Sequence, residues 1–287
     1  MNAPTIEKLS FETESFARKM KIPPCPEIAA KVMAESRAEE PDFKKIGALI
    51  SKDLSLAATV LRTVNSPFYG LRSPVDSIQQ ALMMLGLQTV SSLVVGLLLK
   101  KAFPNMNSNG MRRFWDVSSR QAALGTFVAK STGTVAREVA YTFGLFRQCG
   151  MPILRTQHAD YEPFLDGSAE ERGRPLLEVE SNRFGVTHAQ LGFLLARGWY
   201  MPVDTCQAIL HGTAYPVSEE DRGEAVPSSL NMSALGIVTD WIGDQLDSSS
   251  REIDASDWTF ALGQLGLSED KARELVEAAP AALESSS

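Results

Sequence analysis

The sequence predicts an all-α fold, made of many helices joined by short connections. Apolar residues recur at the i, i+3, i+4, i+7 spacing of a helix face, and capping signals precede several of these segments. Runs of alternating β-branched residues joined by Asn-Gly or Asp-Gly turns, which would indicate strands, do not occur. Nor do strand-like runs alternate with helical ones, as a parallel sheet would require.

Apolar faces mark the helices in chain order. Each face repeats at helical spacing, so one side of each segment is expected to be buried. The clearest faces are Ala57, Val60, Leu61 and Val64; Ile78, Ala81, Leu82 and Leu85; and Leu235, Val238, Ile242 and Leu246.

Helix-start signals agree with these faces. Ser77 precedes Gln80 by three positions, and Thr187 precedes Gln190 by the same interval. This spacing is that of a capping box, in which the side chains of both residues bond to each other's backbone N–H. Helices are therefore expected to begin directly after Ser77 and Thr187.

Proline- and glycine-rich stretches divide the chain. We expect a lead helix over residues 1–20, a main domain over 21–215 and a C-terminal helical extension over 216–287. The main domain is expected to have an N-terminal helical lobe over about 21–103 and a second lobe over about 110–215. The expected long loops are 166–175, 214–229 and 247–250.

The composition is that of an ordinary globular protein, with 44% hydrophobic and 22% charged residues. With 28 Lys and Arg against 35 Asp and Glu, the net charge is −7, and we expect no nucleic-acid partner because such binding relies on clustered cations. Cys25, Cys149 and Cys206 form no C-x-x-C pair, which favours reduced thiols. The charged N-terminus is unlike a signal peptide, and the apolar run 93–99 is too short to span a bilayer. A cytoplasmic protein without membrane contact is expected.

An ordered series of short motifs carries a family resemblance. The series comprises Ile22-Pro23-Pro24-Cys25-Pro26, Ile50-Ser51-Lys52-Asp53-Leu54-Ser55-Leu56, Asn65-Ser66-Pro67-Phe68-Tyr69-Gly70, Leu85-Gly86-Leu87, Phe114-Trp115, Gly144-Leu145-Phe146, Glu180, Phe184-Gly185-Val186-Thr187-His188 and Trp199-Tyr200-Met201-Pro202. It resembles the HDOD family, the HD-related output domains of bacterial signalling proteins, over roughly residues 21 to 215. The resemblance implies a helical domain of the HD superfamily with an N-terminal helical lobe.

Five motif residues are interpreted as structural. Pro67 disfavours helical geometry at the residue before it, so a helix is expected to stop at this motif, and glycine permits a tight turn after it. The five residues are Asp53, Asn65, Ser66, Tyr69 and Gly70. Caps, turns and core packing are their expected roles.

The resemblance also implies a site for metal-dependent phosphoester hydrolysis, held by an adjacent His-Asp pair. Here the corresponding positions are Arg147 and Gln148, and an upstream histidine of the family corresponds to Val117. A guanidinium offers no lone pair to a metal, and a neutral amide is a weak ligand. We therefore expect no metal, no cofactor and no catalytic residue.

The chain has three histidines, His158, His188 and His211, and no two of them share a helical turn. His188 falls on a histidine position of the family. Together with Arg147, Gln148 and His211, it is assigned to a remnant HD pocket, although a purely structural role is the alternative for each residue. His158 is expected to be solvated.

Two interpretations of Arg147 stay open at this point. Its fixed charge could bind a phosphorylated small molecule, or it could bridge helices by pairing with a carboxylate. Cys149, close to this cation, has two interpretations as well: a reactive thiolate or an inert, packed thiol.

The function that the sequence favours is non-catalytic regulation through contact with other signalling proteins. One alternative is a sensor that binds a nucleotide or another phosphorylated small molecule in the remnant pocket. The other alternative is a residual hydrolase, in which Asp116 or Asp160 replaces the missing ligands. No oligomeric state is assigned.

The C-terminal extension lies outside the resemblance and contains Trp241, Trp258 and Phe260. These aromatics could form a partner surface, or they could dock onto the main domain. Ser268 is expected to cap a last helix, which Pro280 is expected to end.

Overall fold

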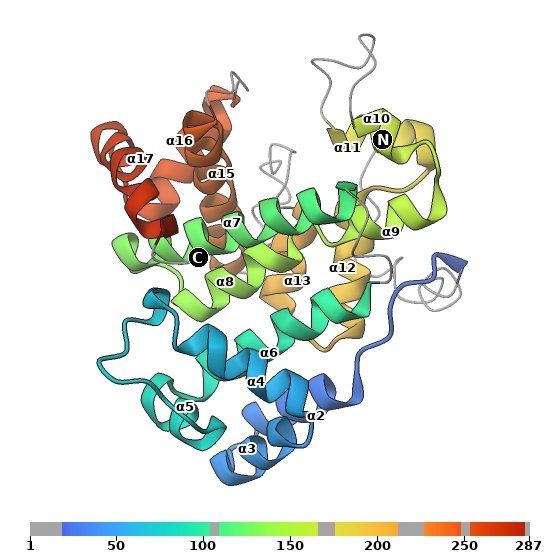
Figure 1. The fold of residues 1–287 in the computed structure, drawn as a ribbon. Coiled ribbons are helices and arrows are strands. Elements are labelled where there is room, and N and C mark those ends of the chain that lie inside the picture. The colour runs from blue at the N-terminus through green and yellow to red at the C-terminus, as the bar shows by residue number, and fades with distance from the viewer. Residues whose placement is uncertain (1–18, 104–108, 166–175, 212–226, 248–252, 285–287) are drawn as a thin grey trace.

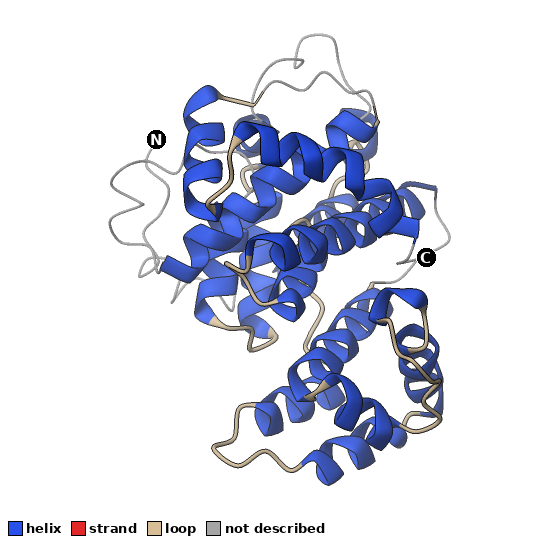
Figure 2. Cartoon of the chain, turned by 90° about the vertical axis from the view of Figure 1, so that its left-hand side faces the viewer, coloured by secondary structure: helices blue, strands red, loops and turns tan. Residues whose placement is uncertain are grey.

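The computed structural model describes residues 19–103, 109–165, 176–211, 227–247 and 253–284. Within these ranges the regular elements are helices and none is a strand, so the all-α prediction is confirmed (Figure 2). The helices are α2 (Glu27–Ser36), α3 (Phe43–Ser51), α4 (Leu54–Val64), the 3-10 turn η1 (Pro67–Tyr69), α5 (Ile78–Leu85), α6 (Leu87–Ala102), α7 (Asn109–Thr132), α8 (Arg137–Phe146), α9 (Gly150–Gln157), α10 (Tyr161–Leu165), α11 (Leu176–Phe184), α12 (His188–Gly198), α13 (Val203–His211), α15 (Pro227–Leu246), α16 (Ala255–Leu265) and α17 (Glu269–Glu284).

The N-terminal lobe consists of α2 to α5 gathered around the apolar helix α6 (Figure 1). The predicted faces of α4 and α5 point into its core, where Val60, Val64 and Leu82 are fully buried. Helix α6 is buried along most of its length and also contacts α8. It therefore joins the lobe to the rest of the molecule.

The central pair, α7 and α8, runs antiparallel with very close backbones. Gly125 faces Ala140, and Gly144 faces Ala122. A Cβ atom on Gly144 would lie 2.6 Å from the Ala122 Cα, so only glycine fits this helix crossing. The close approach fixes the end of α8, which carries Arg147.

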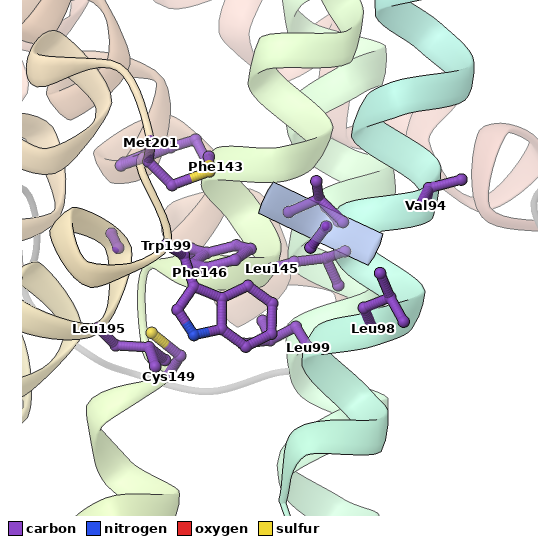
Figure 3. Close-up of a cluster of buried hydrophobic side chains, with 14 of the residues drawn as sticks. Val94, Leu98, Leu99, Phe143, Leu145, Phe146, Cys149, Leu195, Trp199 and Met201 are labelled. Atoms are coloured by element: carbon purple, nitrogen blue, oxygen red, sulfur yellow. The ribbon is translucent and has the colours of Figure 1, made fainter. Parts of the chain in front are cut away.

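The second half of the main domain packs α12 against α9 and α13. Trp199, at the end of α12, is fully buried, and its indole ring lies edge-on to Phe146 with the centroids 5.9 Å apart (Figure 3). Its Nε1 donates to the Pro23 carbonyl at 3.0 Å. The proline-rich entry segment is thereby tied to the end of the domain.

Helices α15 to α17 form a second hydrophobic core with α7 and α8. This core includes Leu124 and Val128 of α7 together with Leu235 and Val238 of α15. The aromatic residues of the extension pack against the same core, and the rings of Trp241 and Trp258 lie 4.7 Å apart. The extension therefore docks on the main domain through α7 (Figure 1).

Two boundary predictions were wrong. Residues 227–229, expected in a loop, form the first turn of α15, because Ser229 is buried against the core. Pro280 does not end the last helix, since α17 continues to Glu284. Its buried face extends through Ala279 and Leu283, so packing outweighs the backbone hydrogen bond that proline removes. The expected lead helix over 1–18, the loop 166–175 and residues 214–226 and 248–250 lie outside the described residues.

Candidate functional site

A buried ion pair lies at Arg147, the residue that the family resemblance assigns to the histidine of a His-Asp pair. Arg147 caps the C-terminal end of α8, and only 2% of its side chain is exposed. Its Nη2 pairs with the carboxylate of Asp240 on α15. This geometry matches the second interpretation of Arg147, in which it bridges two helices, here α8 and α15, by pairing with a carboxylate. A guanidinium that is buried and neutralised is not accessible to an external anion.

The side chains at this position do not fit a metal ion. Arg147 has no lone pair to donate, Gln148 is a partly exposed neutral amide, and Val117 is aliphatic. Within the described ranges, no group of three His, Cys, Asp or Glu residues is close enough to hold a metal. We therefore derive no metal-dependent step for this site.

His188 belongs to a second, separate polar cluster. Its Nδ1 lies 2.8 and 2.9 Å from the two carboxylate oxygens of Glu180, and its backbone N–H donates to Oε2 at 2.8 Å. The hydroxyl of Tyr161 donates to the Oε1 atom of Glu180 at 2.6 Å. All three residues are buried, and the Nε2 atom of His188 has no hydrogen-bond partner in the described structure.

Local structure explains how this cluster forms. Helix α11 carries Glu180 and ends at Phe184, where Gly185 turns the chain with φ of +73°. Thr187 then caps α12 in the predicted capping box, accepting from the Gln190 N–H at 3.1 Å. His188, the first residue of α12, is thus brought back over the carboxylate.

The contacts of Glu180 favour the ionised form of its carboxyl group. Burial alone would raise its pKa, but the interactions with His188, and then the hydroxyl of Tyr161, hold the pKa below the ordinary value of 4.5. Burial, followed by the neighbouring carboxylate, raises the pKa of Tyr161, which stays a neutral hydrogen-bond donor. The Glu180 carboxylate is thus anchored by the Tyr161 hydroxyl and by the backbone and ring of His188.

The four residues assigned to the remnant pocket are not brought into one hydrogen-bonded site. Arg147 pairs with α15, whereas His188 pairs with α11. His211 is the half-buried last residue of α13. His158 packs its ring on Phe184, with the centroids 4.8 Å apart, rather than being fully solvated.

The carboxylates proposed for a residual hydrolase are engaged elsewhere or exposed. Asp160 accepts from Arg183 at 3.0 and 3.3 Å, and this contact lowers the pKa of Asp160. Asp116 is exposed on α7. Neither has a described hydrogen bond to His188.

The five motif residues make contacts of the kind expected for scaffold. Asp53 caps α4 by accepting from the Leu56 N–H at 2.9 Å. Asn65 makes two 2.8 Å hydrogen bonds with the backbone of Val75, which hold the loop between α4 and α5. Gly70 closes η1 in the left-handed region, at φ of +59°.

The remaining two motif residues flank that turn. Ser66 occupies the N-cap position of η1 in an extended conformation, as expected for a residue before proline. Burial, with a smaller contribution from Tyr141, raises the pKa of Tyr69. Ser66 and Tyr69 are both partly buried at this turn.

The reactive interpretation of Cys149 was wrong. Its thiol is fully buried among the side chains of α8 and α12 (Figure 3), and burial raises its pKa far above the ordinary value. The nearby Arg147 does not offset this desolvation because its charge is directed to Asp240. Cys149 is a packed, neutral thiol.

Three residues of these clusters were not predicted as site residues. Glu180 was part of the resemblance and was rejected as half of a carboxylate pair with Glu178, and Tyr161 and Asp240 were not identified. The eight-residue separation of Glu180 from His188 across a glycine turn could have predicted their contact. Such a turn folds the end of one helix onto the start of the next helix. Asp240 gives no such local signal.

Comparisons with known proteins agree with this architecture. A profile of the HDOD domain matches residues 22–215. A proposed phosphohydrolase from Shewanella amazonensis has a TM-score of 0.72 and 22% identity, covering 95% of this chain and 97% of that one. An HDOD domain protein of unknown function from Geobacter sulfurreducens has a TM-score of 0.70 and 21% identity, covering 95% of each chain.

A protein from Treponema pallidum is 25% identical over 227 residues, which are 77% of this chain and 44% of that protein. The chain thus spans less than half the length of the curated relatives it matches. Among the described residues, no helix combines the length and apolar character needed to cross a bilayer.

Proposed function

The chain belongs to the HDOD domain family, and from that premise we propose that it is a non-catalytic regulatory domain that acts by binding other signalling proteins. One observation carries the non-catalytic part. The position that would hold the family's metal-binding pair is filled by the Arg147–Asp240 ion pair, in which the guanidinium is 2% exposed. A metal ion would need lone-pair donors in this space, and a guanidinium has none to offer.

A metal and activity measurement tests this part of the proposal. The full chain is purified without chelator, exposed to manganese, iron and zinc, and analysed for bound metal, and is then assayed with phosphodiester and nucleotide substrates. We expect almost no metal per chain and no hydrolysis. About one or two bound metals per chain, with hydrolysis that His188→Ala abolishes, would overturn the proposal.

Exposed apolar side chains support the protein-binding part. Six large hydrophobic residues are exposed within the described ranges, and four of them lie in the N-terminal lobe. These four are Phe43, Leu54, Met83 and Met84. Neighbouring methionines adapt to partners of different shape because their side chains are flexible and polarizable.

Affinity capture with the full chain tests this second part. We expect a signalling protein that binds the wild-type chain and is lost with the Met83→Lys/Met84→Lys variant. The matched control is Lys44→Glu, an exposed change in charge on α3. Equal capture by the wild type and by both variants would count against a role for this lobe, and failure to bind any signalling protein would count against the proposed function itself.

A further inference from the structure

A surface pocket of about 490 Å³ lies where the first half of α7 passes the C-terminal end of α15. It is lined by Arg112, Arg113, Asp116, Val117, Arg120 and Asp247. Its volume lies within the range of about 300 to 1,000 Å³ that is usual for small-molecule sites. Val117 in its lining is the residue that the family resemblance assigns to an upstream histidine position.

The charge of this pocket favours an anion. Three guanidinium groups face two carboxylates in its lining. The first turn of α7 carries no acidic residue, and the N-terminal end of a helix has a partial positive charge that adds to that of Arg112 and Arg113.

Arg120 already holds an anion in the geometry that phosphate adopts. Its Nη1 and Nη2 donate to the two oxygens of Asp247 at 2.7 and 2.6 Å, a two-bond fork that a phosphate group reproduces. The side chains are 31% and 51% exposed, and solvent-screened ion pairs contribute little to folding stability. A ligand can therefore replace Asp247 at little cost in folding free energy.

An unpartnered polar side chain lies next to this ion pair. Gln121 is 7% exposed, and its Oε1 atom has no hydrogen-bond partner in the described structure. A Cβ atom on Gly243 would lie 3.5 Å from Gln121 Nε2 and 3.9 Å from Arg120 Nη2, so the two side chains flank the same point of α15. Buried polar groups without partners are costly, and such groups mark places where a ligand or water is held.

We propose that this pocket binds a small phosphate-bearing molecule, whose phosphate replaces the Asp247 carboxylate on Arg120. Arg112 and Arg113 complete the cationic rim, and the Gln121 Oε1 atom beside Arg120 can accept a hydrogen bond from a hydroxyl group of the ligand. Displacement of Asp247 loosens the end of α15 from α7, which gives the ligand a route to the C-terminal helices. The site goes beyond the proposed function and does not depend on it, because ligand binding and partner capture are measured separately.

Isothermal titration calorimetry of the full chain with inorganic phosphate and with adenosine monophosphate tests the site. We expect at least one probe to bind, with the affinity falling about tenfold in Arg113→Gln as one charge-assisted contact is lost. Asp247→Asn is expected to raise the affinity severalfold, because it removes the competing carboxylate. Tighter binding of the nucleotide would identify it as the better ligand, and equal binding would identify the phosphate group alone; both outcomes support the site.

The matched control is Arg273→Gln, which removes an exposed arginine from α17. Its affinity for both probes should equal that of the wild-type chain. The proposal is overturned if neither probe binds the wild-type chain or Asp247→Asn at millimolar concentration. It is also overturned if Arg113→Gln and Arg273→Gln weaken binding equally, because the effect would then be general surface charge.

Discussion

Glu180 shows how a single buried carboxylate organises its surroundings. It accepts hydrogen bonds from Tyr161 and from the backbone and ring of His188. Glu180→Gln keeps the shape but turns one acceptor oxygen into a donor that faces other donors. We expect a loss of about 3 kcal/mol in the free energy of unfolding, measured by urea denaturation.

The control for this variant is Asp160→Asn, which breaks an ion pair with Arg183 whose side chains are 55% and 38% exposed. Its cost should stay below about 1 kcal/mol because solvent screens the pair. Equal costs for the two variants would show that the buried cluster contributes no more than a surface contact.

The same carboxylate predicts a pH dependence. The interactions that outweigh burial hold the pKa of Glu180 below 4.5 in the folded protein, so the folded state binds fewer protons than the unfolded chain. The resulting stability is present above pH 4.5 and is lost as the pH falls through the folded pKa. As the pH is lowered from 4.5, the wild type should therefore lose more stability than Glu180→Gln. Thermal unfolding of both proteins over this pH range measures the difference. Parallel curves for the two proteins would contradict this assignment.

At the residue scale, the sequence predicts contacts that are local and misses those that depend on packing. The capping box of Thr187 and Gln190 forms as predicted, because its hydrogen bonds join residues three positions apart. The partner of Arg147 lies 93 residues away on α15, and no periodicity or motif connects the two. The sequence therefore allowed a carboxylate partner for Arg147 to be considered, but it did not identify Asp240 as that partner.

At the scale of helices, glycine decides how closely two elements approach. Gly150 begins α9, and a Cβ atom there would lie 1.9 Å from the backbone oxygen of His188. Gly150→Ala must therefore push α9 away from α12, and we expect it to cost about 3 kcal/mol or more in the free energy of unfolding.

Gly263 provides the matched control, since it is also helical but has open space at its Cβ position. Gly263→Ala should stabilise the protein by about 0.5 to 1 kcal/mol, because alanine loses less conformational entropy on folding. Chemical denaturation of both variants would measure the difference. A stabilised Gly150→Ala would show that α9 and α12 are not in close contact.

Helix type and apolar faces followed from the sequence, whereas helix ends were less reliable. The faces of α4, α5 and α15 are buried as their spacing indicates. Pro280 would end an isolated helix, yet the buried face of α17 continues past it. Local propensity loses to packing wherever the apolar face extends beyond the expected stop.

At the scale of the whole molecule, the family match and the folded unit do not coincide. The match ends at residue 215, but α15 to α17 cover Leu124 and Val128 of α7 and supply the counter-ion of Arg147. A chain truncated after residue 226 would expose this apolar face and leave a buried charge unpaired. We expect it to lose cooperative thermal unfolding, measured by circular dichroism. A sharp transition near that of the full chain would show that the helices are a separate appendage.

The Arg147–Asp240 pair also predicts a coupling between these two parts of the chain. Asp240→Leu leaves a guanidinium buried without a partner and should cost about 3 to 5 kcal/mol. Arg147→Met leaves a carboxylate that is 16% exposed and can gain some solvation, so a smaller cost is expected. In the double variant both charges are gone, and the total cost should be smaller than the sum by about 2 kcal/mol. Strict additivity in urea denaturation would mean that the two helices are held by their apolar contacts alone, and that the residue replacing the metal ligands has no energetic connection to the C-terminal helices.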